Sequence, residues 1–180
     1  LILHEMGHTL GLMHNMKASQ LWSPAEINNA TVTKQVGLTG SVMDYPASNI
    51  AADPAKQGQY FTASPGPYDM WVIEYGYSSS VEDAKAERDR LNKILARSTE
   101  PQLTFGNDAD DMRAPGKAID PRVMVNDLTN DAIAFSADRM TMDRNLMKKI
   151  KAKYSIEGQS YQELKYSFLV IWNDYATAAG

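Results

Sequence analysis

Apolar residues recur at helical spacing in the last fifty residues, and this spacing predicts two helices. The first spans residues 130–154, and every seventh residue in it is apolar: Ile133, Met140, Met147 and Tyr154. The second follows the capping sequence Ser160–Glu163 and has an apolar face made of Tyr161, Leu164, Phe168, Ile171 and Tyr175. Two such neighbouring faces predict that the helices pack as an antiparallel hairpin, with the apolar stripes forming a core.

The rest of the pattern predicts shorter helices separated by loops. These helices are expected over residues 1–10, 24–35, 68–76 and 80–97. Gly11 and Gly76 are expected to end the first and third, because glycine readily adopts the left-handed conformation found at helix C-termini. Residues 102–105 are predicted to form a short strand, residues 47–67 a long loop and residues 114–122 irregular chain. The pattern therefore predicts a mainly α chain.

Composition narrows the possible classes of function. The 180 residues carry a net charge of −4, which gives no electrostatic basis for binding nucleic acid. The absence of a long apolar run argues against a transmembrane helix. The chain contains no cysteine, so disulfides and thiolate metal ligands are excluded.

The strongest chemical signal lies at the start of the chain. His4, Glu5, His8, Gly11 and His14 follow the spacing H-E-x-x-H-x-x-G-x-x-H, which uses all three histidines of the sequence. Two histidines four residues apart lie on one face of a helix and can bind one metal ion, and a turn at the glycine can bring the third to it. Three protein ligands leave a fourth position for water, and the adjacent glutamate can act as its general base.

Two simpler interpretations compete with a catalytic zinc site. The histidines could lie on a surface helix without binding a metal, or they could form a structural zinc site. Glu5 beside the first ligand and the open fourth position both favour catalysis over a structural role. The ligand set alone does not fix the metal, because cobalt, nickel or iron can occupy such nitrogens.

Residues 4–14 resemble the zinc motif of the metzincins, a clan of zinc metalloproteases. Ser41–Tyr45, with the sequence Ser-Val-Met-Asp-Tyr, is similar to the Met-turn of that clan. The resemblance implies that Met43 forms a hydrophobic floor beneath the histidines. It also implies that Tyr45 donates a hydrogen bond to the transition state, although an ordinary core or surface tyrosine would need no such role.

The resemblance extends to large bacterial zinc-dependent metalloproteases with a helical C-terminal region, in which a segment like Tyr68–Tyr77 follows the Met-turn. It implies that residues 1–78 are the C-terminal half of an α+β catalytic domain and that residues 79–180 form a helical region packed on it. The upstream half, with the sheet that pairs with substrate, is expected to precede the given sequence, which starts inside its own zinc-binding helix. Export to the periplasm or the bacterial cell surface is also implied.

The predicted function is that of a zinc-dependent endopeptidase acting on a peptide or protein substrate. An alternative is a degenerate protease that serves as a protein-binding module, and the isolated chain could also be an inactive fragment of an active enzyme. The acidic segment 106–111 is predicted to be a solvated loop rather than a calcium site, because it lacks the spacing of a calcium-binding loop.

Overall fold

A computed structural model describes residues 1–111 and 120–180, so most of the predicted irregular segment 114–122 lies outside the described residues. The α-helices are α1 (Ile2–Thr9), α2 (Ala30–Val36), α3 (Pro67–Tyr77), α4 (Ala84–Leu95), α5 (Ala132–Tyr154) and α6 (Gln162–Ala179). Short 3₁₀ helices are η1 (Ala18–Leu21), η2 (Pro54–Lys56), η3 (Ala96–Thr99) and η4 (Pro101–Leu103). Every regular element in these two ranges is helical, which confirms the mainly α prediction.

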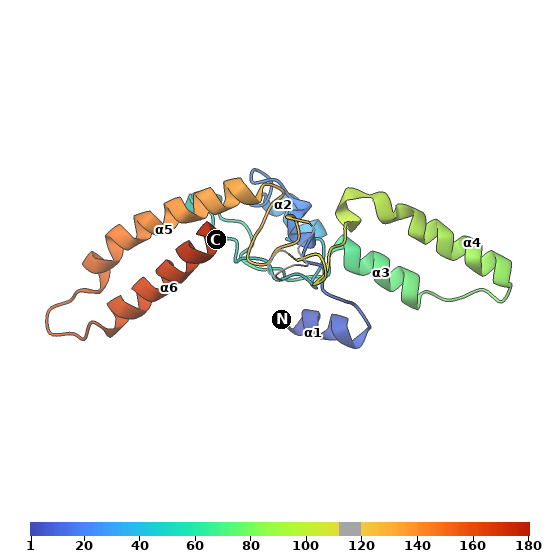
Figure 1. Cartoon of the computed structure of the whole chain (residues 1–180), viewed down its shortest axis with the longest axis horizontal. Coiled ribbons are helices and arrows are strands. Elements are labelled where there is room, and N and C mark those ends of the chain that lie inside the picture. Colours follow the sequence, from blue (N-terminus) through green and yellow to red (C-terminus); the bar gives the residue numbers. More distant parts are fainter. Residues whose placement is uncertain (112–119) are drawn as a thin grey trace.

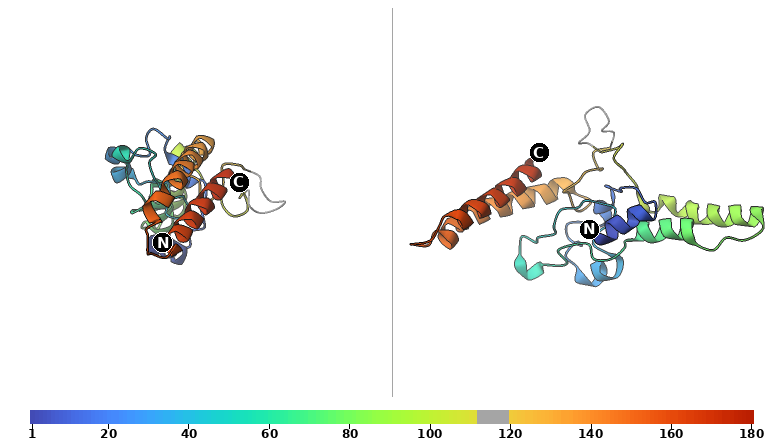
Figure 2. Two further views of the ribbon diagram at one scale, coloured as in Figure 1. Left: turned by 90° about the vertical axis from the view of Figure 1, so that its left-hand side faces the viewer. Right: turned by 90° about the horizontal axis from the view of Figure 1, so that it is seen from below.

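The molecule is elongated, with a loop-rich central body between two helical hairpins (Figure 1). Helices α5 and α6 run antiparallel at one end, as predicted, and α3 and α4 form the hairpin at the other end (Figures 1 and 2). Arg139 of α5 bonds Asp174 of α6 at 2.8 Å and also donates to the Ser48 carbonyl, so the first hairpin is tied to the central body. None of the helices in the described ranges has the length and apolar character needed to cross a bilayer.

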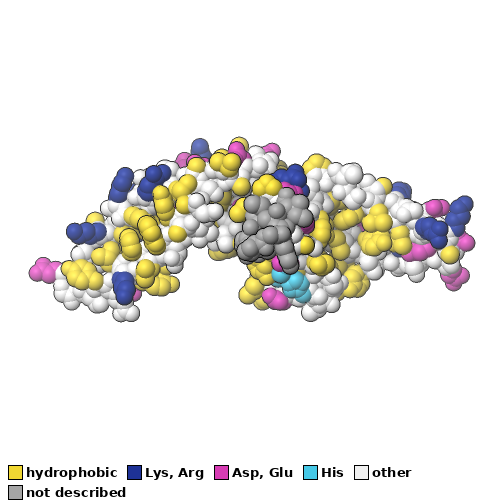
Figure 3. Space-filling model, in the orientation of Figure 1, with side chains coloured by type: hydrophobic (Ala, Val, Ile, Leu, Met, Phe, Trp, Pro, Cys, Tyr) yellow, Lys and Arg dark blue, Asp and Glu magenta, His cyan; other side chains and the backbone are white. Residues whose placement is uncertain are grey.

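The apolar stripes of α5 and α6 are only partly buried. Ile150 is buried, but Ile133 is 85% exposed, so the prediction that it belongs to a core is wrong. Phe168 and Trp172 of α6 are also exposed, and apolar side chains line the surface of this hairpin in Figure 3. The reason is geometric: each of two paired helices buries only the face that meets its partner, and a third layer is needed to cover the rest.

Several predicted element ends are displaced by side-chain caps. The helix expected from residue 24 begins at Ala30, because Asn29 accepts the hydrogen bond of Thr31 N and caps the helix there. Similarly, α4 begins after Asp83, whose side chain caps it, rather than at residue 80. Gly76 lies inside α3 instead of ending it.

The predicted strand at residues 102–105 is absent; η4 covers its first half. The buried side chain of Asn15 donates to the Thr104 carbonyl and accepts from Gly106 N, at 2.9 and 3.1 Å. These backbone groups are therefore satisfied by one amide side chain, and no neighbouring strand is required.

The central body has a core assembled from loops. Its largest fully buried apolar side chains are Met16, Leu38, Met43, Leu103, Val123 and Leu128. Trp22 donates its indole N–H to the Gly37 carbonyl at 2.9 Å. Gly40 N donates to the Ala18 carbonyl, and the Gly40 carbonyl accepts from Tyr68 N. Loops far apart in sequence are thereby fixed against one another, and this frame holds the segments that surround α1.

Candidate metal centre

The three histidines of the zinc motif converge. His4 and His8 lie one turn apart on α1, which ends at Thr9. Gly11 follows with a φ of +85°, the left-handed conformation expected for it, and the chain turns back so that His14 meets the other two. One ring nitrogen from each histidine can be chosen so that all three atoms lie within 4.8 Å of one another. This spacing suits three ligands of a single ion.

Each imidazole is held through its Nδ1 atom. His4 Nδ1 donates to the Val42 carbonyl at 2.8 Å, and His8 Nδ1 donates to the Leu12 carbonyl at 2.9 Å. A carbonyl oxygen can only accept, so Nδ1 carries the proton in both rings and Nε2 keeps its lone pair. The third ring, His14, bonds the Asp108 carboxylate through Nδ1 at 2.9 Å. Such partners are the usual means of orienting histidine ligands toward a metal.

The His4 ring fits a metal ligand on a further ground. Its side chain is buried, with 4% of its surface exposed, and its Nε2 atom has no hydrogen-bond partner in the part of the chain that the structure describes. Burial lowers the pKa of His4, so the neutral, ligating form is favoured. A buried lone pair without a partner is costly, and a cation bound there would satisfy it. The residues present therefore fit a zinc ion.

Tyr45 covers the histidine cluster. Its ring centroid lies 4.7 Å from that of His4 and 5.0 Å from that of His14, and its hydroxyl lies 3.1 Å from His14 Nε2. The hydroxyl is the donor in this bond when His14 Nδ1 donates to Asp108. A metal on His14 Nε2 would take the place of this hydrogen bond and leave the hydroxyl beside the ion.

Met43 lies against the ligand-bearing helix. Its side chain is fully buried, and a Cβ atom added at Gly7 would lie only 2.3 Å from the Met43 sulfur. Gly7 therefore allows Met43 to approach α1 between the first two histidines. Gly7 was not predicted to have a role, but a glycine inside a short helix is a detectable signal, because it lowers the stability of the helix without a local benefit.

Asp69 of α3 holds residues 41–45, the predicted Met-turn, in place. Its carboxylate accepts hydrogen bonds from Val42 N and Gly66 N, both at 2.8 Å, and from the Ser41 hydroxyl. Burial raises the pKa of Asp69, and these hydrogen bonds to the ionised form act in the opposite direction. Since Val42 in turn accepts from His4, Asp69 is linked to the first ligand through one residue.

Asp108 was missed by the sequence reasoning, which placed it in a solvated acidic loop. Its side chain is mostly exposed, yet it forms the ion pair with His14. Asn107 and Asp110 close the loop on itself, since Asn107 N donates to Asp110 and Ala109 N donates to Asn107. No local pattern marks Asp108 out from Asp110, because its partner lies 94 residues away.

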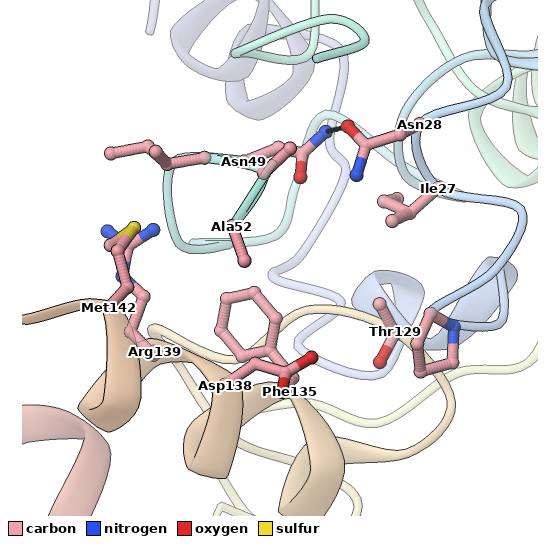
Figure 4. Close-up of a pocket in the computed structure, with 12 residues that line it drawn as sticks. Ile27, Asn28, Asn49, Ala52, Thr129, Phe135, Asp138, Arg139 and Met142 are labelled. Carbon is pink, nitrogen blue, oxygen red and sulfur yellow. Dashed lines mark hydrogen bonds between the residues drawn. The ribbon is translucent and has the colours of Figure 1, made fainter. Parts of the chain in front are cut away.

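A cleft of about 560 Å³ opens beside the first ligand. Its walls come from the start of α1, the Met-turn and the loop before α3: Leu1–His4, Ser41, Val42, Asp44–Ala47 and Phe61–Ala63. The lining is largely apolar, with His4 and Tyr45 at one edge. A second, smaller hollow of about 70 Å³ lies between α5 and the loops that carry Ile27 and Asn49, and Phe135 points into it (Figure 4).

Comparison with known proteins identifies the family of the chain that carries these three histidines. The chain belongs to the Met-zincin family, whose model matches residues 1–180. No curated protein and no solved structure matches it. Family membership supports a zinc metallopeptidase in general.

Proposed function

We propose that this chain carries the zinc centre of an endopeptidase. The observation that supports this most strongly is the arrangement of the three imidazoles. Their Nδ1 atoms are bound to protein acceptors, and one ring nitrogen from each imidazole can be chosen so that the three lie within 4.8 Å of one another. Zinc is the metal expected for three neutral imidazoles with an open fourth site, and the Met-zincin family agrees with it.

Zinc bound by these residues would supply a water of lowered pKa and would polarise the scissile carbonyl. Glu5 is the proposed general base. It follows the first ligand on α1, it is exposed, and no side chain in the described ranges bonds its carboxylate. It would accept the proton of the attacking water and transfer it to the leaving amine.

Tyr45 is proposed to stabilise the transition state. Its hydroxyl is a donor at the edge of the histidine cluster, and it is free to turn toward a developing oxyanion once it releases His14. Met43 has a different role in this proposal: its buried sulfur packs on Gly7 and supports the ligand helix from below, without contacting the reacting atoms.

The cleft beside His4 is proposed to hold a side chain of the peptide substrate. Its apolar walls favour an apolar or aromatic residue. We further propose that an upstream half of the same protein supplies the strand that pairs with the substrate backbone, so that this chain alone would have little peptidase activity. Membership of the large bacterial metalloproteases with a helical C-terminal region, division at residue 78 and export remain proposals based on the sequence resemblance.

A protein-binding module without catalysis is the second candidate. The exposed apolar side chains of α6, including Phe168 and Trp172, favour it, because such surfaces often meet a partner. The two candidates differ in what they require of Glu5, since a binding module has no use for a general base.

The test is a Glu5→Gln variant in a form of the protein that includes the upstream half. We expect unchanged zinc content and loss of peptide hydrolysis by at least about 10³-fold, because the isosteric amide cannot accept the proton. His14→Ala should lose both zinc and hydrolysis. A zinc-loaded Glu5→Gln variant as active as the wild type would refute the endopeptidase proposal. A zinc-loaded wild type that cleaves no peptide would favour the binding module.

A further inference from the structure

Two buried carboxylates without counter-charges lie behind the Met-turn. Asp44 and Asp127 are each 5% exposed, although they are 83 positions apart in the sequence. One oxygen of Asp44 and both oxygens of Asp127 have no hydrogen-bond partner of good geometry in the part of the chain that the structure describes, although the Ser19 hydroxyl lies close enough to both carboxylates to lower the pKa of each. Such unsatisfied groups are rare in native proteins and call for an explanation.

Ser19 connects the two carboxylates. Its backbone N–H donates to Asp44 Oδ2 at 2.6 Å, and its carbonyl accepts from Thr129 N at 3.1 Å, two residues after Asp127. The segment 126–129 is also bonded to the residues that follow Asp44, since Asn126 N donates to the Tyr45 carbonyl at 2.9 Å and Ala47 N donates to the Asp127 carbonyl at 3.0 Å. The helix η1 and two loops therefore meet where these oxygens lie.

The backbone is strained around Asp127. Asn126 and Thr129 have φ angles of +63° and +77°, a region that residues with a side chain adopt at a cost of about 1 kcal/mol or more each. Thr129 is β-branched, for which this conformation is especially unfavourable. Backbone strain therefore lies on both sides of Asp127, whose carboxylate has no counter-charge and lies near that of Asp44.

Ionised carboxylates in this position repel each other. No lysine or arginine in the described ranges pairs with either group. Burial, with the charge of Asp127, raises the pKa of Asp44, and burial raises the pKa of Asp127 to about 7. Near neutral pH the pair needs either a proton or a bound cation, because an unpaired buried charge is strongly unfavourable.

We propose that Asp44, Asp127 and Ser19 bind a divalent cation, Ca²⁺, at a second metal site distinct from the histidine centre. All the donors are hard oxygen atoms, which suit Ca²⁺ better than zinc. Asp44 lines the large cleft, so water can enter to complete the coordination shell. The ion would bridge the Met-turn and segment 126–129, which fixes the backbone of Tyr45 from both sides.

The acidic segment 106–111 is not this site. Asp108 is taken up by His14, and Asn107 and Asp110 bond within the loop. The new site instead uses residues from η1 and two loops, so no calcium-loop spacing exists in the sequence to reveal it.

Calorimetric titration with CaCl₂ tests the proposal, after chelator treatment and reloading with one equivalent of zinc so that the histidine centre is filled. We expect one Ca²⁺ per wild-type chain and a rise in the thermal unfolding midpoint of roughly 3–10 °C at 1 mM CaCl₂. Asp127→Asn should lose both effects. Asp138→Asn, which alters an exposed carboxylate on α5, should keep them.

The wild-type titration is decisive by itself if a variant fails to fold. No saturable uptake of Ca²⁺ by the wild type at millimolar concentration would overturn the proposal and leave a shared proton as the explanation of the pair. Equal uptake by folded Asp127→Asn and wild type would also overturn it. Circular dichroism without calcium checks folding, and Asp127→Asn should be at least as stable as wild type there, because it removes a buried charge.

Discussion

Val42 and His4 are joined by a hydrogen bond of 2.8 Å from the imidazole Nδ1 to the backbone carbonyl. This bond fixes the tautomer of the most buried ligand. The backbone N–H of Val42 in turn donates to the Asp69 carboxylate. The orientation of His4, the first proposed ligand, is thus set by the predicted Met-turn, and the position of that turn is set by α3. The helix that follows the Met-turn consequently belongs to the metal site even though none of its side chains is a predicted ligand.

Removing the Asp69 carboxylate should weaken metal binding at a distance. In Asp69→Ala the N–H groups of Val42 and Gly66 and the Ser41 hydroxyl lose their acceptor. We expect zinc affinity to fall by about 10–100-fold, and the free energy of unfolding by about 2–4 kcal/mol. Competition with a chromogenic chelator measures the first, and urea unfolding the second. Asp89→Asn, on the exposed face of α4, is the control, and equal zinc affinities in all three proteins would contradict the link.

Asp108 should contribute to metal affinity through His14. Asp108→Ala leaves the His14 ring without its Nδ1 partner, so we expect zinc affinity to fall by about 10-fold. Asp108→Asn retains an acceptor oxygen and should lose less. Since the aspartate is exposed, global stability should change by less than about 0.5 kcal/mol. A loss of stability as large as that of Asp69→Ala would show that the loop itself, and not the ligand contact, depends on Asp108.

Gly7 and Met43 should be energetically coupled. Gly7→Ala places a methyl group where the buried sulfur lies, and we expect a loss of about 1–3 kcal/mol in the free energy of unfolding. Gly76→Ala is a matched control, because Gly76 also lies in a helix but has open space around it, so alanine should stabilise by about 0.5–1 kcal/mol. Thermal or urea unfolding compares the two.

A double-mutant cycle checks the cause. Combining Gly7→Ala with Met43→Ala should cost less than the sum of the two single changes, because the smaller side chain makes room for the new methyl group. Strict additivity would mean that the sulfur does not restrict position 7.

The hairpin of α5 and α6 should be destabilised by ionisation of Asp143. This carboxyl is buried, faces Asp174 of α6 and Arg139 of its own helix, and has a pKa raised to about 6, chiefly by burial and next by Asp174. Because the folded-state pKa exceeds the unfolded value, the neutral form favours folding. The penalty is absent below about pH 4, grows as the pH rises toward 6 and is complete above it.

Asp143→Asn avoids this penalty. We expect it to match the wild type in urea unfolding at pH 4 and to be more stable by on the order of 1 kcal/mol at pH 7.5. Asp138→Asn, one turn away and exposed, should show no such difference between the two pH values. A stability gain of Asp143→Asn that does not change with pH would point to packing and not to ionisation.

The sequence determined most of the helices and the three proposed metal ligands, because both follow from local spacing. Residues four apart share a helix face whatever the rest of the fold does, so a helix at this position necessarily makes His4 and His8 neighbours. The left-handed turn at Gly11 could be predicted because residues with a side chain rarely adopt that conformation, whereas glycine adopts it readily. The first residue of a helix was less predictable. Helices α2 and α4 are capped by Asn29 and Asp83, and each begins later than the nearest capping-type sequence predicted.

Only the tertiary structure decided what surrounds the ligands. Asp108, Asp69 and Gly7 act through partners that are 27 to 94 residues away, or through the close approach of another loop. The proximity of Asp44 to Asp127 and the exposure of Ile133 also depend on the tertiary structure. Side-chain periodicity reports which residues share a face of one element. It carries no information about which loops meet, since that depends on how the whole chain is packed.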